Sequence, residues 1–151
     1  MAGEKKQLGQ LLLEAGLVTE SQVSEVLAYQ REHHMVFGKA VVSMGMVPET
    51  ELLKVLGHHL GLPSLDITKY NIQDEALKLV SEDFARKNSI IPLFLIENSL
   101  TIATADPLNI DVIDQLTRDT GMEIMLVLSI EMDIERSIDL YYRSTTSLLA
   151  T

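Results

Sequence analysis

Cysteine is absent from the 151 residues of the chain. Its absence excludes disulfide bonds, thiolate metal sites and cysteine nucleophiles, and it suits a reducing compartment. Basic residues are also few, with 12 lysines and arginines against 22 aspartates and glutamates and a formal net charge of −10. Nucleic acids and anionic membranes are bound through clustered cations, so the composition argues against both as partners.

Long apolar runs are missing as well. The most apolar stretch, residues 90–96, contains a proline and falls far short of the roughly 20 residues that a membrane-spanning helix needs. Residues 1–7 carry two lysines and a glutamate, and no signal-peptide core follows them. We therefore expect a cytoplasmic protein without direct membrane insertion.

Motifs for common enzyme chemistry are absent too. The chain has neither the G-x-x-x-x-G-K-[ST] pattern of Walker nucleotide sites nor the G-x-S-x-G elbow of many hydrolases. Its four histidines form the adjacent pairs His33-His34 and His58-His59, whose members point about 100° apart on a helix and suit solvated helix ends better than one metal ion. We predict no enzymatic activity, no metal and no cofactor.

A tandem repeat fills the first part of the chain. Residues 7–30 align without gaps on residues 36–59, with six identical pairs among 24 and the five-residue spacer REHHM. Gly16 and Gly45 stand where a left-handed residue would end a first helix in each copy. Thr19 with Gln22 forms a capping-box pattern, and Pro48 suits the first position of a helix, so we predict second helices over 20–33 and 48–60.

A different pattern follows Gly61 and Pro63. We predict a helix over 74–87, a hairpin of the strands SIIPLFLI and SLTIATA turning at Glu97-Asn98, and a helix that ends at Gly121. The strand EIMLVLS and a last helix, capped by Ser129 and reaching about Tyr142, complete the order. The fold class is α+β: a helical tandem-repeat bundle of two hairpins over 1–62, a connector over 63–71, and a small α/β sandwich with a three-stranded sheet over 72–145.

The repeat and its spacer resemble the MshEN domain, a cyclic di-GMP-binding module at the N-terminus of many type II secretion and type IV pilus ATPases. Its motifs read approximately R-L-G-x-x-L-V-x-x-G-x-I-x-x-x-x-L-x-x-x-L-x-x-Q. The later segments ARKNSIIPLFLIENSLTIATADPLN, TGMEIMLVLS and IERSIDLYY are similar to the rest of that ATPase region. The resemblance covers about residues 7 to 142.

The resemblance implies a regulatory domain with cyclic di-GMP as a ligand. Each motif copy would take half of the two-fold symmetric ligand. The implied binding residues are Gln7, Leu8, Gly9, Leu12 and Gln30 in the first copy, and Phe37, Gly38, Val41 and His59 in the second. Glycines near helix starts would allow close approach of backbone N–H groups to phosphate. The sequence departs from the motif where Gln7 and Val36 replace arginine and His59 replaces the terminal glutamine.

Two alternatives remain open beside ligand binding. The apolar motif positions suit the core of a plain four-helix bundle. The same fold also suits a pure protein-docking domain that recruits an ATPase to the cytoplasmic part of an inner-membrane secretion or pilus assembly protein, without binding nucleotide. In either case the resemblance implies a downstream ATPase domain as a partner and a location at the inner face of the inner membrane.

Overall fold

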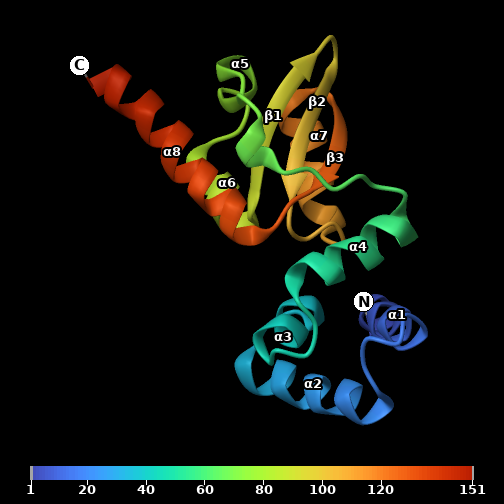
Figure 1. The fold of residues 1–151 in the computed structure, drawn as a ribbon. Coiled ribbons are helices and arrows are strands. Elements are labelled where there is room, and N and C mark those ends of the chain that lie inside the picture. Colours follow the sequence, from blue (N-terminus) through green and yellow to red (C-terminus); the bar gives the residue numbers. More distant parts are fainter. Residues whose placement is uncertain (1, 151) are drawn as a thin grey trace. The chain divides into compact units, whose positions relative to one another are not determined.

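The chain folds into two compact units, an N-terminal unit over Met1–Gly61 and a C-terminal unit over Leu62–Thr151. The structure is a computed structural model that describes the backbone of residues 2–150 and the side chains of residues 8–142. Figure 1 shows helices alone in the first unit, and helices with a small sheet in the second. The predicted α+β class is therefore confirmed.

The N-terminal unit consists of two helical hairpins, one from each motif copy. Its helices are α1 (Ala2–Glu14), α2 (Glu20–His33), α3 (Phe37–Ser43) and α4 (Glu49–Leu60). Helix α3 packs against the other three, and α1 also packs against α4. Both predicted stops are confirmed, because Gly16 and Gly45 have φ angles of 73° and 75°, a conformation that a side chain disfavours.

The second helix of each copy begins differently. The predicted capping box of α2 is confirmed, since Gln22 N donates to Thr19 Oγ1 at 3.2 Å and Thr19 N donates to Gln22 Oε1 at 2.8 Å. Helix α4 has no such box. Pro48 precedes it in an extended conformation as its N-cap residue, one position earlier than predicted.

The sheet of the C-terminal unit has the strand order β1-β2-β3. Strands β1 (Ile90–Ile96) and β2 (Ser99–Thr104) form the predicted antiparallel hairpin, in which Glu97 has a positive φ of 55°. Strand β3 (Glu123–Leu128) is parallel to β2. A parallel pair needs a long crossover, which here contains helix α7 (Ile110–Thr120), drawn behind the strands in Figure 1.

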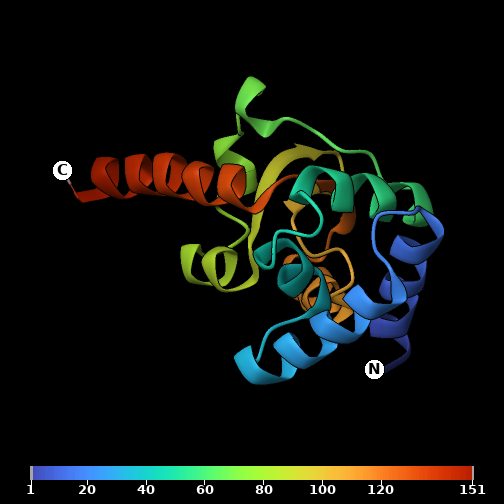
Figure 2. The same ribbon diagram turned by 60° about the horizontal axis from the view of Figure 1, so that its bottom comes forward.

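Further helices pack on this sheet. They are α5 (Asp74–Leu77), α6 (Glu82–Asn88) and α8 (Glu131–Ala150), and the 3₁₀ turn η1 (Ile67–Lys69) packs against α8. Helices α5, α6 and α8 contact β1, whereas α7 contacts β3. Figure 2 shows α8 as one straight helix that extends beyond the sheet. One buried hydrophobic cluster forms the core of this unit. Its members come from along the whole unit and include Ile67, Ile72, Leu100, Ile102, Ile138 and Tyr142.

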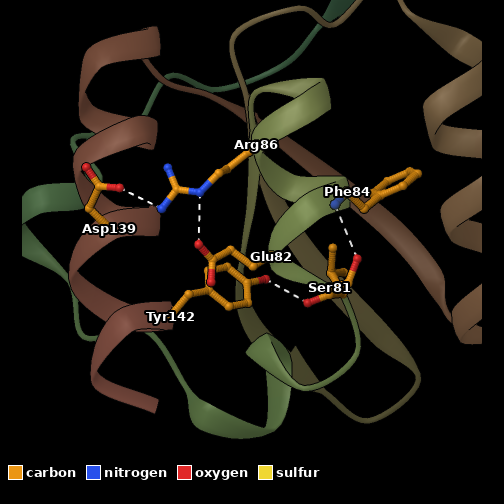
Figure 3. A network of polar contacts seen from close by, with 7 residues as sticks. Ser81, Glu82, Phe84, Arg86, Asp139 and Tyr142 are labelled. Carbon is orange, nitrogen blue, oxygen red and sulfur yellow. Dashed lines mark hydrogen bonds and ion pairs between the residues drawn. The ribbon is translucent and has the colours of Figure 1, made fainter. Parts of the chain in front are cut away.

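Polar contacts join α6 to α8 (Figure 3). Arg86 donates to Asp139 at 2.6 Å and to Glu82 at 2.9 Å. The buried hydroxyl of Tyr142 donates to the backbone oxygen of Val80 at 2.8 Å. The contacts of Arg86 with Asp139 and of Tyr142 with Val80 link residues more than 50 positions apart in sequence.

Three predicted helix limits in the C-terminal unit are wrong. The helix predicted over 74–87 is two helices: α5 ends at Leu77, and Ser81 caps α6 by accepting from Phe84 N at 3.2 Å. The last helix continues to Ala150, beyond Tyr142. Ser129 does not cap it: its buried Oγ is the one buried side-chain polar atom among residues 8–142 without a hydrogen-bond partner.

Within the described residues, no helix combines the length and the apolar character that crossing a membrane requires.

Candidate functional site

The motif glycines lie at helix–helix contacts that mirror each other. A Cβ added to Gly9 would lie 3.5 Å from Val23 and 3.6 Å from Phe37. A Cβ added to Gly38 would lie 3.4 Å from Leu52 and 3.5 Å from Leu8. In the repeat alignment Val23 corresponds to Leu52, and Leu8 corresponds to Phe37. Each glycine therefore touches the second helix of its own copy and the residue that precedes the glycine of the other copy.

This reciprocal contact gives the N-terminal unit a pseudo-two-fold arrangement. The sequence predicted the repeat but missed Val23 and Leu52 as contact partners of the glycines. Both stand 14 residues after the motif glycine of their own copy, and this shared spacing could have identified them. Only Gly38 lies near a helix start, as the second residue of α3; Gly9 lies in the interior of α1, so the expectation of a helix start at Gly9 is wrong. An interior N–H is engaged within the helix, whereas a first-turn N–H has no intrahelical acceptor.

The apolar motif residues lie inside the unit. Leu8, Leu12, Phe37 and Val41 are all buried. In this structure they pack as the core of the helical bundle, which is the plain alternative given by the sequence. They thus position the backbone around the glycines, and a base would reach their side chains only after local rearrangement.

The polar ends of the two motifs differ. Gln30 closes the first motif near the end of α2 with only 7% of its surface exposed, whereas His59 of the second motif is exposed on α4. Val36 precedes α3 and is 54% exposed. The side chain of Gln7, its counterpart in the first motif, lies outside the described residues. The exposed surface at Val36 is apolar where the family motif carries a cation.

The histidines of the N-terminal unit lie at exposed helix ends. The four histidines are exposed at the ends of α2 and α4, as predicted, and His33 stacks on Tyr29 with ring centroids 3.9 Å apart. Among the described residues, no group of three or more histidines, aspartates or glutamates is placed to hold a metal ion. The hydroxyl of Thr68 donates to Asp66 and lowers the pKa of that exposed carboxyl.

Solved structures share this fold. The structure of MshE with cdg is 29% identical in sequence, covers 89% of this chain and 98% of its own, and superposes with a TM-score of 0.79. The N-terminal domain of XpsE, at 20% identity, covers 89% of this chain and 92% of its own with a TM-score of 0.76, which supports the fold alone.

A curated relative extends the comparison to a longer protein. The type IV pilus assembly ATPase PilB of Myxococcus xanthus is 29% identical over 136 residues, which are 90% of this chain but 24% of PilB. The chain thus spans about a quarter of that relative's length.

The MshEN domain family model matches residues 60–148. This match covers the C-terminal unit, whereas the likeness to MshE spans most of both units. More than half of the residues fall within the family model, and the chain therefore belongs to the MshEN domain family.

Proposed function

We propose that the N-terminal unit binds cyclic di-GMP and that the chain is a non-catalytic regulatory domain of a type II secretion or type IV pilus ATPase. The observation that carries this proposal is the reciprocal packing of Gly9 with Phe37 and of Gly38 with Leu8. Cyclic di-GMP has two guanines and two phosphates related by two-fold symmetry. Two motif copies related by a pseudo-two-fold can therefore present equivalent groups to the two halves of the ligand. The likeness to MshE, whose structure contains cdg, supports the same ligand.

The proposed site consists of equivalent positions in the two motifs. Around the glycines, Leu8, Leu12, Phe37 and Val41 hold the helices at close distance. Polar contacts come from the motif ends, where the amide of Gln30 can donate to and accept from a guanine edge. The two halves are unequal, since His59 replaces that amide in the second copy. The full proposed set is Gln7, Leu8, Gly9, Leu12, Gln30, Phe37, Gly38, Val41 and His59.

Restoring the motif cations tests ligand binding most directly. Val36 is largely exposed, so Val36→Arg places a guanidinium at the motif position without removing core volume. Gln7→Arg is its counterpart in the first copy. Each new charged hydrogen bond is worth about 1.5–3 kcal/mol, and isothermal calorimetry with cyclic di-GMP should record the gain in affinity. A double variant that folds normally and gives no heat at about 100 μM ligand would contradict the proposal.

Gln30 needs a careful control because it is buried. Truncation to alanine would remove packing together with the amide, so Gln30→Ala is a poor probe of binding alone. Gln30→Met keeps nearly the same volume and removes only the polar head. We expect Gln30→Met to retain the fold and to weaken cyclic di-GMP binding several-fold. Equal affinity in this variant and the wild type would remove Gln30 from the site.

Protein docking by the C-terminal unit is a second candidate function. It is favoured by an uneven distribution of charge: residues 62–151 hold seven lysines and arginines against fifteen aspartates and glutamates, a net charge of −8, compared with −2 for residues 1–61. Such a surface attracts a basic partner. We propose the cytoplasmic part of an inner-membrane secretion or pilus assembly protein as that partner, which would hold the chain at the cytoplasmic face of the membrane. Co-sedimentation with that cytoplasmic part at low and high salt tests it, and binding independent of salt would contradict the electrostatic basis.

An absence of catalysis follows from both candidates. The chain alone should release no phosphate from ATP above the buffer background, and turnover that persists after repeated purification would overturn the non-catalytic assignment.

A further inference from the structure

The two edge strands of the three-stranded sheet differ in how many of their outward backbone groups are already hydrogen-bonded. Along β1, the backbone N–H of Gln73 donates to Leu93 O at 3.0 Å, and Leu95 N donates to the side-chain oxygen of Gln73 at 2.9 Å. Pro92 has no N–H, and the register shifts between Pro92 and Phe94. A proline, a shifted register and a covering residue are the usual means of protecting an edge strand from further pairing. The β1 edge is therefore closed.

The β3 edge is closed at one end only. Leu128 N donates to Pro63 O and Leu65 N donates to Leu128 O, both at 2.8 Å. Backbone groups alternate along a strand, so those of Ile124 and Leu126 point to the same outer side as those of Leu128. No hydrogen bond joins the N–H and C=O groups of Ile124 and Leu126 to another of the described residues on that side. Four backbone groups in line are thus free to pair.

These free groups belong to a rigid strand. The side chains of Ile124 and Leu126 pack against the buried cluster of the C-terminal unit. The strand is also fully paired with β2 along its inner side, from Glu123 to Leu128. An added strand would therefore meet a pre-ordered template, which lowers the entropy cost of binding.

An apolar surface lies beside this edge. Met125 is 48% exposed and lies in register with Thr101, which in turn lies opposite Phe94. Residues in register across a sheet project from the same face. Tyr70 contacts Phe94 edge-to-face with ring centroids 6.0 Å apart. A strand added next to β3 would place one apolar side chain against Met125 and extend this surface.

The charges around the edge select the partner. Glu123 opens β3, and α7, which packs against β3, carries Asp111, Asp114 and Asp119 against the single cation Arg118. Together with the net charge of −8 for residues 62–151, these carboxylates favour lysine and arginine on an incoming segment.

A second copy of this chain fits the edge poorly. It would bring the same net negative charge to the contact. If the β3 strands of two copies paired antiparallel about Met125, Met122 of one copy would lie opposite Leu128 of the other. Ser64 of that second copy already occupies this position beside Leu128. A short segment of another protein avoids both conflicts.

We propose that the outer edge of β3 binds one extended, basic segment of a partner protein as a fourth strand. The segment lies opposite Glu123–Val127, and its path ends where residues 63–65 cover Leu128. Its apolar residues alternate toward Met125, and its lysines or arginines meet the surrounding carboxylates. This proposal rests on the docking candidate and is independent of cyclic di-GMP binding.

Peptide binding to the whole chain tests the fourth strand. The probe is a fluorescein-labelled peptide of about eight alternating lysines and valines, followed by fluorescence anisotropy. A matched peptide methylated on alternate backbone nitrogens keeps the charge but cannot complete the strand pairing. We expect the first peptide to bind and the methylated peptide to bind roughly tenfold more weakly or not at all. Equal binding of the two peptides overturns strand addition.

Variants locate the binding edge. Leu126→Pro removes an outward N–H and should abolish binding, with circular dichroism as the check on folding. Met125→Lys changes only an exposed side chain, so it tests the edge even if Leu126→Pro does not fold, and we expect roughly a tenfold loss. Met132→Lys is the control, because Met132 is 56% exposed and lies on α8, outside the strand to which the peptide is proposed to bind. Unchanged binding in Met125→Lys, or an equal loss in Met132→Lys, overturns the assignment to β3.

Two further measurements separate this proposal from its alternatives. Sedimentation of the wild-type chain at about 100 μM should show a monomer; a dimer that Met125→Lys disrupts would make a second copy the occupant and overturn the basic partner. Calorimetry with cyclic di-GMP should be unaffected by Met125→Lys. Val36→Arg should alter that calorimetry and leave peptide binding unchanged, so failure of one proposal is visible separately from failure of the other.

Discussion

The two units of this chain reach compact folds by different routes. The N-terminal unit uses one helical hairpin twice, and its contacts occur in equivalent pairs, such as Gly9 with Phe37 and Gly38 with Leu8. The C-terminal unit has no internal copy. Its contacts join dissimilar elements, such as Arg86 on α6 with Asp139 on α8, 53 residues apart. In a repeat, a contact seen in one copy therefore predicts its counterpart in the other copy through the alignment, whereas each contact of a mixed fold has to be observed separately.

The difference in charge gives the two units different suitable ligands. The N-terminal unit is nearly neutral at −2 and can accept an anionic dinucleotide with little repulsion. The C-terminal unit, at −8, repels anions and attracts cationic protein segments. The charge distribution thus fits the two proposals, cyclic di-GMP binding by the first unit and protein docking by the second.

The largest expected effect tests whether the units fold separately. Leu12→Ala and Ile102→Ala each remove a fully buried side chain, one from each unit, and each should cost about 2–5 kcal/mol. If the units are energetically independent, Leu12→Ala speeds amide exchange in residues 8–60 alone and Ile102→Ala in residues 90–128 alone. Hydrogen-exchange mass spectrometry measures both. Faster exchange in both units from either substitution would mean that the chain unfolds as one cooperative body.

The next effect isolates a long-range contact of the C-terminal unit. Tyr142→Phe removes the hydroxyl that donates to Val80 O and leaves a carbonyl unpaired, at a cost of about 1–3 kcal/mol. Burial, with a smaller contribution from the charge of Glu82, raises the pKa of Tyr142 above its ordinary value of 10.0. The folded state therefore holds this proton more tightly than the unfolded chain. The resulting stability is present below pH 10 and is lost as the pH rises further toward the folded-state pKa.

Urea unfolding followed by circular dichroism, from neutral pH to about pH 11, measures this dependence. The decline in stability above pH 10 should be smaller in Tyr142→Phe than in the wild type. Tyr70→Phe, at an exposed tyrosine of the same unit, is the control and should leave the decline unchanged. Identical pH profiles for Tyr142→Phe and the wild type would contradict a role for this hydroxyl.

Local signals made much of the fold predictable. The glycine stops, the capping box of Thr19 and the Glu97 turn depend on neighbouring residues, and each was read correctly from the sequence. Errors arose where distant contacts decide the outcome. Ser129 has a residue type suited to capping, yet it is buried at the end of β3 with its N–H donating to Thr104 O.

The motif residues could be located from the sequence, but their burial could not be predicted. The alignment located the motif residues, and the structure places Leu8 and Phe37 inside the unit. Burial is set by how α1 and α3 pack, and the apolar character of a residue does not reveal whether a helix or a ligand covers it. The sequence therefore proposed ligand contacts at positions that serve packing in this structure.

Ser129, which was predicted to cap a helix, and Ser81, which does cap one, should respond differently in stability when replaced by alanine. Ser81→Ala removes a hydrogen bond to Phe84 N and should cost about 1 kcal/mol. Ser129→Ala removes a buried hydroxyl that has no partner, so it should be neutral or should stabilise the C-terminal unit by about 1 kcal/mol. Chemical denaturation of the two variants measures both. Destabilisation by Ser129→Ala would indicate a bonded hydroxyl, and a water-mediated bond would be the first explanation to test.

The smallest expected changes in stability come from replacing equivalent glycines in the two motif copies. Gly9 lies inside α1, and a methyl group there would make ordinary contacts with Val23 and Phe37, so Gly9→Ala should gain up to about 1 kcal/mol from helix propensity. Gly16 has a positive φ and no atom within 4 Å of an added Cβ, so backbone strain alone should make Gly16→Ala lose about 1 kcal/mol. Thermal unfolding of the pair measures opposite shifts. The copies Gly38→Ala and Gly45→Ala should repeat this pattern, with a smaller gain at Gly38, where the contact with Leu52 is closer at 3.4 Å. If the two copies gave opposite signs at equivalent glycines, the pseudo-two-fold packing on which ligand binding is proposed would not describe the energetics of this unit.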